Sequence, residues 1–225
     1  MEKIITQEKE SGNIGSSLDY FLKFKISKSK KILDIGCNYG SLIYNLYKNG
    51  YKNVYGIDIN KKSIRNGQKN YKEIKNKIKI YTGKKIPWRK EHFDIILMFD
   101  VIEHIPEVEK FLKLEVNRVL KRNGLLIFQT PNKIINIIWI YIKNKKIKIK
   151  IEKEHCSLQT YFNLKKIIKN SGFHSLKIEK HTINTKYNRN KIRKKIGILG
   201  LALIYLAQNL PIVIYPNFWG FSKKE

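Results

Sequence analysis

The chain has 225 residues, 42% of them hydrophobic, which is enough for one α/β domain with a sizeable core. Two cysteines exclude a disulfide framework, and the polar segment Met1–Glu10 carries no signal-peptide core, so we expect a cytoplasmic protein. The net charge of +28 has two interpretations: attraction to nucleic acid or an anionic membrane surface, or a lysine-rich composition spread over the whole chain.

The predicted organisation is a helical lead-in, residues 1–30, followed by a main domain over residues 31–225. The first 15 residues are polar, and Ser16 or Ser17 is the expected cap of a short amphipathic helix.

A glycine-bearing turn joins the first predicted strand to a helix. The apolar run Ile32–Ile35 is typical of a buried strand, and Ser41–Lys48 has a helical pattern. Glycines let a backbone approach a ligand closely, and a helix start offers free N–H groups to a negative group. Asn38 replaces a third glycine and tolerates a left-handed conformation. The turn consists of Gly36, Cys37, Asn38, Tyr39 and Gly40.

Residues 53–58 form the second predicted strand, which ends in a carboxylate. At that place Asp58 can accept both ribose hydroxyls of a bound nucleoside. The alternative is that Asp58 caps the helix starting near Asn60, which we expect to cover residues 61–76.

Strands and helices continue to alternate up to residue 132. We predict strands at residues 78–81, 93–100 and 125–129, and a helix at residues 107–121 that ends at Asn123-Gly124. Alternation implies a parallel sheet with right-handed crossovers, and ligands bind at the carboxyl ends of such strands. Those ends carry Asp34, Asp58, Thr82 and Asp100.

Three features of this sequence resemble class I S-adenosylmethionine-dependent methyltransferases. They are the spacing Asp34-x-Gly36-x-x-x-Gly40, the carboxylate Asp58 at the end of the second strand, and the later segment Asp100-Val-Ile-Glu103-His104. The match runs over residues 30–132 and is similar to the methyltransferase type 11 and ubiquinone-biosynthesis group. It implies a Rossmann-like, mostly parallel seven-stranded sheet with helices on both faces and an antiparallel last strand. The cofactor-binding residues that it implies are Asp34, Gly36, Cys37, Asn38, Gly40, Asp58, Ile59, Thr82, Gly83 and Asp100.

One position departs from the family pattern. The acid that would hold the adenine amino group is replaced by Thr82, whose hydroxyl accepts a hydrogen bond more weakly than a carboxylate. In the family, the N-terminal helix often lies over the cofactor, and here it has two open roles, that one or core packing.

For catalysis we expect His104 to remove the acceptor proton, with Glu103 beside it. The alternative is that His104 only orients its loop. His155 either approaches the same pocket or lies at the surface. Some relatives bind a divalent ion through Glu-x-x-Glu-His, but here Asp100 replaces the first Glu, and we assign no metal ligands.

The C-terminal third departs from the common pattern. We expect a basic and apolar insertion at about residues 133–155, in which residues 134–142 form a helix over the acceptor pocket and residues 143–153 a strand or hairpin. We also expect an apolar helix at about residues 190–210. Its stretch 196–207 has three open roles: a core helix, an acceptor-pocket or lipid-facing helix, or an oligomer interface. The remaining predicted elements are a helix at 158–170 and strands at 176–181 and 217–222.

The resemblance implies an enzyme that transfers a methyl group to a small-molecule or lipid-linked acceptor, at oxygen. The alternatives are an RNA methyltransferase that uses the basic surface, or a non-catalytic S-adenosylmethionine-binding protein. Because basic residues precede the apolar helix, an anionic membrane surface is a candidate partner, which would make the protein peripheral to a membrane.

Overall fold

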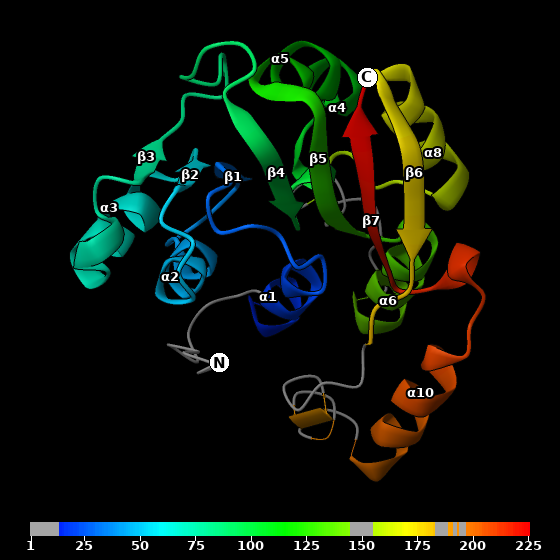
Figure 1. The fold of residues 1–225 in the computed structure, drawn as a ribbon. Helices are drawn as coiled ribbons and strands as arrows, with labels where there is room; N and C mark the ends of the chain where they lie inside the picture. The colour runs from blue at the N-terminus through cyan, green and yellow to red at the C-terminus, as the bar shows by residue number, and fades with distance from the viewer. Residues whose placement is uncertain (1–13, 145–154, 183–188, 191–192, 194–196) are drawn as a thin grey trace.

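The computed structural model describes residues 14–144, 155–182, 189–190, 193 and 197–225. Its centre is a seven-stranded sheet with the order β3-β2-β1-β4-β5-β7-β6 (Figure 1). Strands β1 to β5 pair in parallel, and β7 is antiparallel to both β5 and β6. This confirms the predicted fold class. The strands are β1 Ile32–Ile35, β2 Val54–Asp58, β3 Ile78–Ile80, β4 Phe93–Phe99, β5 Leu120–Pro131, β6 Phe173–Glu179 and β7 Asn217–Lys224.

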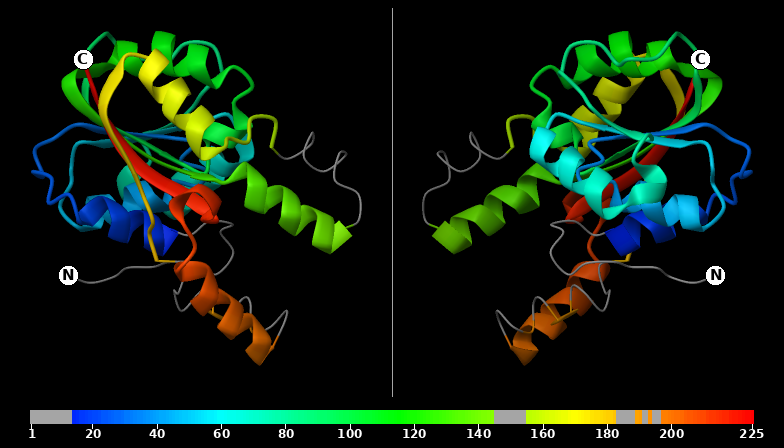
Figure 2. Two further views of the ribbon diagram at one scale, coloured as in Figure 1. Left: turned by 90° about the vertical axis from the view of Figure 1, so that its right-hand side faces the viewer. Right: turned by 90° about the vertical axis from the view of Figure 1, so that its left-hand side faces the viewer.

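Helices connect the strands and cover both faces of the sheet (Figure 2). A π-helical turn, Leu112–Val116, joins α4 and α5 into one continuous segment, and short 3-10 turns occur at Lys72–Ile74, Ile102–His104 and Ile212–Ile214. The helices are α1 Ile14–Leu22, α2 Ser41–Lys48, α3 Lys61–Asn70, α4 Val108–Phe111, α5 Asn117–Val119, α6 Lys133–Asn144, α8 Tyr161–Asn170 and α10 Ile198–Gln208.

Side chains that alternate along the central strands build two hydrophobic cores. On β4, Ile95 and Leu97 pack in one core with α1, α2 and α3, whereas Ile96 and Met98 pack in the other with α4, α5 and α8. Successive side chains of a strand point to opposite faces, so a strand that is apolar throughout is buried on both sides. Strand β4 is therefore buried on both sides.

The strand order reverses between β1 and β4. From β1 the chain adds β2 and then β3 on one side of the sheet, and it then crosses to add β4 and β5 on the other side. Because the strand-connecting helices on either side of this point lie on opposite faces, a crevice forms at the carboxyl ends of β1 and β4, where such sheets bind ligands.

The helix predicted at residues 107–121 ends earlier than expected, at Val119, and β5 starts at Leu120. The pairing register jumps from Phe93 opposite Leu120 to Ile95 opposite Leu125. The extra residues of β5 therefore form a bulge, in which Asn123 has a φ of 57°. The expectation that Asn123-Gly124 ends the helix was wrong, because this turn signal serves a β-bulge instead.

Three further helix boundaries differ from the sequence predictions. Helix α1 starts at Ile14, so Ser16 and Ser17 are buried inside it and do not cap it. Helix α3 ends at Asn70, and a 3-10 turn follows. Helix α8 starts only at Tyr161, because the Thr160 side chain caps it by accepting a hydrogen bond from the backbone N–H of Asn163.

The C-terminal third of the chain is described only in part. Strand β6 begins at Phe173, three residues before the predicted start. Most of the predicted basic strand at 143–153 lies outside the described residues. Within the described ranges, every helix falls short of the length and apolar character that a membrane crossing requires.

Candidate functional site

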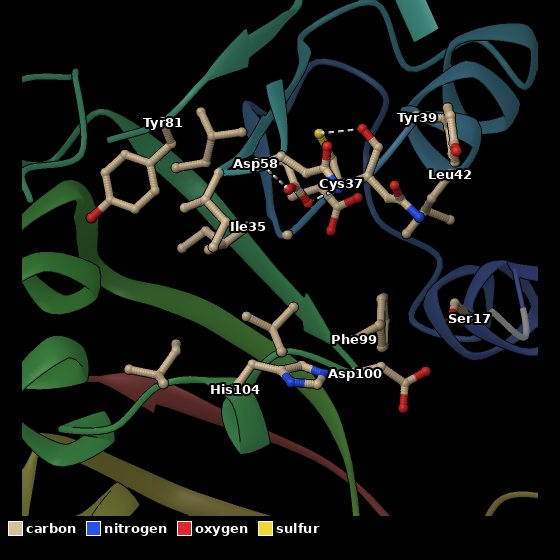
Figure 3. Close-up of a pocket in the computed structure, with 18 of the residues that line it drawn as sticks. Ser17, Ile35, Cys37, Tyr39, Leu42, Asp58, Tyr81, Phe99, Asp100 and His104 are labelled. Carbon is tan, nitrogen blue, oxygen red and sulfur yellow. Dashed lines mark hydrogen bonds between the residues drawn. The ribbon is translucent and has the colours of Figure 1, made fainter. Parts of the chain in front are cut away.

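A cavity of about 640 Å³ opens at the carboxyl ends of β1, β2 and β4. Figure 3 shows Cys37 and Asp58 on one wall, with Phe99, Asp100 and His104 across the cavity from them. Nine of the residues predicted for the site line it, namely Asp34, Gly36, Cys37, Asn38, Asp58, Ile59, Gly83, Asp100 and His104. The other three, Gly40, Thr82 and Glu103, are not among the lining residues.

The turn between β1 and α2 has three left-handed positions, of which Asn38 was predicted from the sequence. Gly36 has a φ of 77°, Asn38 of 50° and Gly40 of 81°. The backbone N–H groups of Gly36 and Cys37 both donate to the Ile57 carbonyl, at 2.8 and 3.0 Å, which ties the turn to β2. A Cβ at Gly36 would lie 2.3 Å from a methyl group of Val101, so this position requires glycine.

Two glycines support the turn without lining the cavity. Gly40 precedes α2, and a Cβ there would lie 3.0 Å from a methyl group of Ile78. Gly67 is a buried residue of α3, and a Cβ there would lie 2.0 Å from the Tyr39 carbonyl oxygen. Gly67 is not among the residues predicted from the sequence, although a glycine inside a helical pattern is itself a signal of close packing.

Asp34 and Asp58 supply the negative charge of the cavity wall. Asp34 is only 4% exposed, and burial, followed by the nearby Asp58 carboxylate, raises its pKa well above the ordinary value. Asp58 accepts hydrogen bonds from the backbone N–H groups of Asn38 and Asn60, at 2.8 and 2.7 Å. The Asn60 side chain, and not Asp58, caps α3 by accepting from the N–H of Ser63.

The loop after β3 presents a different residue from the one predicted. Thr82 is exposed, whereas the adjacent Tyr81 is buried and lines the cavity together with Gly83. Gly83 has a φ of 81°, and a Cβ there would meet no atom within 4 Å. The side chain available to a bound ligand at this edge is therefore that of Tyr81.

After β4 the chain turns sharply at Asp100, whose φ is 53° and whose backbone N–H donates to the Gln129 backbone carbonyl and side-chain oxygen. His104 lines the cavity with its side chain 49% exposed. Glu103 lies behind it, 1% exposed, and accepts a hydrogen bond of 2.9 Å from the Thr130 hydroxyl. Burial, followed by the Asp100 carboxylate, raises the pKa of Glu103 to about 8.

A cluster with metal-ligand chemistry adjoins the cavity. Ligand atoms of Glu103, His104 and His155 all lie within 4.8 Å of one another, and the two imidazole rings are 5.1 Å apart. His155 thus approaches His104, one of the two predicted alternatives, although it is not among the cavity-lining residues. Asp100, which the family pattern groups with Glu103 and His104, is not in this cluster. One carboxylate and two imidazoles suit a divalent transition metal.

The N-terminal helix packs in the core and also reaches the cavity. Leu18, Tyr20 and Phe21 are buried in the core, while Ile14 and Ser17 line the cavity. The described part of α6, by contrast, contributes no residue to the cavity wall, and the expectation that this helix covers the acceptor pocket stays a prediction. The same holds for the described residues of α10.

A family model described as a methyltransferase domain matches residues 7–178, which is most of the chain. The chain belongs to this methyltransferase family. Its order of strands, its glycine turn and its cavity at the reversal point are those of the class I members, whose cofactor is S-adenosyl-L-methionine. The resemblance stated from the sequence is therefore confirmed at the level of family and cofactor.

Several curated relatives are O-methyltransferases by name. The chain is 37% identical over 109 residues to the ubiquinone biosynthesis O-methyltransferase of Pelagibacter ubique, covering 47% of this chain and 44% of that protein. It is 35% identical over 107 residues to the enzyme of the same name from Bradyrhizobium diazoefficiens, covering 46% and 40%. The chain thus spans less than half the length of these two relatives.

Solved structures show the same fold. A possible histamine N-methyltransferase from Thermotoga maritima is 17% identical with a TM-score of 0.61, and the match covers 94% of this chain and 89% of that one. A putative methyltransferase complexed with the Trm112 activator from Haloferax volcanii is 10% identical with a TM-score of 0.72, covering 93% and 88%. At these identities the comparisons establish architecture alone.

Proposed function

We propose that this chain transfers the methyl group of S-adenosylmethionine to an oxygen atom of a small-molecule or lipid-linked acceptor. The observation that carries the proposal is the composition of one cavity. Asp34, the glycine turn and Asp58 form its cofactor wall, and His104 lies across from them. The names of the curated relatives, which are O-methyltransferases of ubiquinone biosynthesis, support an oxygen acceptor.

The cofactor wall suits an adenosyl amino acid. The buried Asp34 carboxylate is suited to the cationic amino group, because a carboxylate at a low-dielectric site gains most from a positive partner. Each oxygen of Asp58 accepts one backbone hydrogen bond and keeps a further lone pair for a ribose hydroxyl. Tyr81 and Ile59 add surface beside this end of the cavity.

The opposite wall is apolar apart from Asp100 and His104. Phe99, Val101 and Ile105 line it, which favours an acceptor with a substantial hydrophobic part. Holding the acceptor oxygen in line behind the methyl group can contribute about 7–11 kcal/mol to rate acceleration. His104 is the proposed base, because its imidazole reaches into the cavity and remains half exposed for proton release.

A second role for His104 is favoured by its cluster with Glu103 and His155, which fits a divalent cation. Such a cation, when bound, would lower the pKa of a coordinated acceptor hydroxyl. His104 can be base or ligand, but one lone pair cannot serve both purposes. Metal analysis of the purified wild type and of His155→Ala separates the roles, because a ligand role predicts stoichiometric metal that His155→Ala loses.

The test of the activity is a transfer assay with labelled methyl donor on lipid, small-molecule and RNA fractions of a cell extract. We expect label in the lipid or small-molecule fraction. His104→Ala should lower turnover by about 10²–10⁴-fold without changing cofactor affinity. His174→Ala is the matched control, since this histidine is the second residue of β6, the edge strand of the sheet, and does not line the cavity. Label in RNA alone, or full turnover by His104→Ala, would contradict the proposal.

A further inference from the structure

Helices α6 and α10 emerge from the edge of the sheet that holds the cavity. Helix α6 directly follows the carboxyl end of β5, and α10 precedes β7, whose first residue Asn217 pairs with Pro131 at that same end. Figure 2 shows both helices projecting from the body, α6 sideways and α10 downward. The outer surfaces of both helices are therefore available for contact with another molecule.

Helix α6 carries an exposed apolar stripe. Ile134, Ile138 and Tyr141 are 37%, 49% and 57% exposed. Their spacing of i, i+4 and i+7 places them on one face of the helix. Soluble surfaces scatter such residues singly, so a row of three indicates a contact surface.

Helix α10 carries a second exposed apolar stripe. Ile198, Tyr205 and Leu206 are 78%, 66% and 62% exposed, and the exposed Ala202 lies between them. Ile204 is only 4% exposed, so one side of the helix packs while the other does not. No charged residue occurs between Ile198 and Gln208. This side of the helix is unlike a water-facing surface, which would carry charged residues.

The sequence around both stripes is strongly basic. Residues 133–151 contain six lysines and no Asp or Glu, and residues 180–224 contain nine Lys or Arg and no Asp or Glu. Among the described residues, Lys133, Lys180, Arg189 and Arg193 are exposed. Positive charge beside an apolar helix face is complementary to an anionic lipid surface, which offers phosphates next to hydrocarbon.

We propose that the α6 and α10 stripes dock this chain on an anionic lipid bilayer, parallel to its surface. The 11 residues of α10 extend about 16 Å, half the thickness of a hydrocarbon core, so the helix lies in the interface and does not cross it. A second copy of the chain fits less well, because two such faces would bring their basic flanks together. Docking places the cavity edge toward the membrane, and the link to a lipid-linked acceptor rests on the proposed function.

Vesicle co-sedimentation tests the docking without any methyl donor. Wild-type protein is mixed with phosphatidylcholine vesicles with and without phosphatidylglycerol, at about 0.15 M and about 1 M salt, where the Debye length falls from about 8 to about 3 Å. The variant Ile198→Ser/Tyr205→Ser/Leu206→Ser removes the α10 stripe, and Ile134→Ser/Ile138→Ser/Tyr141→Ser removes the α6 stripe. Leu114→Ser is the matched control, because this leucine is 55% exposed and lines a separate basic cavity with Arg122 and Lys224.

We expect wild-type protein to bind preferentially to the vesicles that contain phosphatidylglycerol. The vesicle affinity of each stripe variant should fall at least about thirtyfold at either salt concentration, and that of Leu114→Ser should change less than about twofold. Unchanged binding by both stripe variants would overturn the proposal and leave charge alone as the cause. If wild-type protein is a dimer, and the stripe variants are monomers that bind vesicles as wild type does, the stripes would be assigned to contact with a second copy of the chain. Cofactor titration of each variant shows that it is folded, and failure of methyl transfer with intact docking would refute only the proposed function.

Discussion

Gly67 links helix α3 to the cofactor turn, and replacing it tests how tightly that turn is held. A Cβ on Gly67 would lie 2.0 Å from the Tyr39 carbonyl oxygen and 2.8 Å from its carbon. Real Cβ atoms essentially never approach another atom within 3.0 Å, so in Gly67→Ala the helix and the turn must separate by about 1 Å.

Two effects of opposite sign decide the outcome of Gly67→Ala. Helix propensity alone favours alanine by about 1 kcal/mol. Overpacking costs about 1–3 kcal/mol, and the upper end applies because a backbone carbonyl cannot rotate away as a side chain can. We therefore expect the free energy of unfolding to fall by about 2 kcal/mol. The S-adenosylmethionine affinity should drop at least about tenfold, since the displaced turn carries the Asn38 amide that holds Asp58.

Urea denaturation and isothermal titration measure these two quantities. Asn66→Ala on the same helix is the control, because it changes propensity without the Tyr39 contact and should leave the cofactor affinity unchanged. If Gly67→Ala were as stable as Asn66→Ala and bound the cofactor equally well, the proposed support of the turn by α3 would be refuted.

Further predictions concern three carboxylates. Asp58→Ala should weaken cofactor binding more than tenfold by calorimetry, from the loss of charge-assisted hydrogen bonds, and unchanged affinity would limit Asp58 to holding the backbone. Because the pKa of Asp34 is raised in the free protein, binding of the cationic amino group of the cofactor should release a proton, and cofactor affinity should rise with pH. Equal binding heats in buffers of different ionisation enthalpy would exclude this proton release. The pKa of Glu103 is raised from 4.5 to about 8 in the folded state, so the ionised Glu103 destabilises the fold increasingly as pH rises between these values. The free energy of unfolding of Glu103→Gln should therefore exceed that of wild type by about 2–4 kcal/mol at pH 8 and differ little at pH 4. Parallel pH profiles of stability for the two proteins would contradict the buried-acid assignment.

The local parts of the site were predictable from the sequence. The β1 strand, the left-handed Asn38 and the α2 start all follow from residues adjacent in the chain, and their predicted bounds match the structure. Asp58 was placed correctly at a strand end, because parallel strands present their last residues at one edge.

The rest depends on packing between distant segments. The cluster of His155 with Glu103 joins residues about 50 positions apart, and no local pattern encodes that distance. The inward turn of Tyr81 in place of Thr82 is likewise set by where β3 ends against β2. A turn signal such as Asn123-Gly124 has several structural uses, and only strand pairing with β4 selects the bulge.

The central claim is that the cavity at the end of β1, β2 and β4 binds S-adenosylmethionine. Isothermal titration of the wild-type chain with this cofactor tests it most directly. The structure predicts saturable binding at one site per chain, competed by S-adenosylhomocysteine and weakened in Asp58→Ala. The absence of saturable binding at millimolar cofactor would contradict the account.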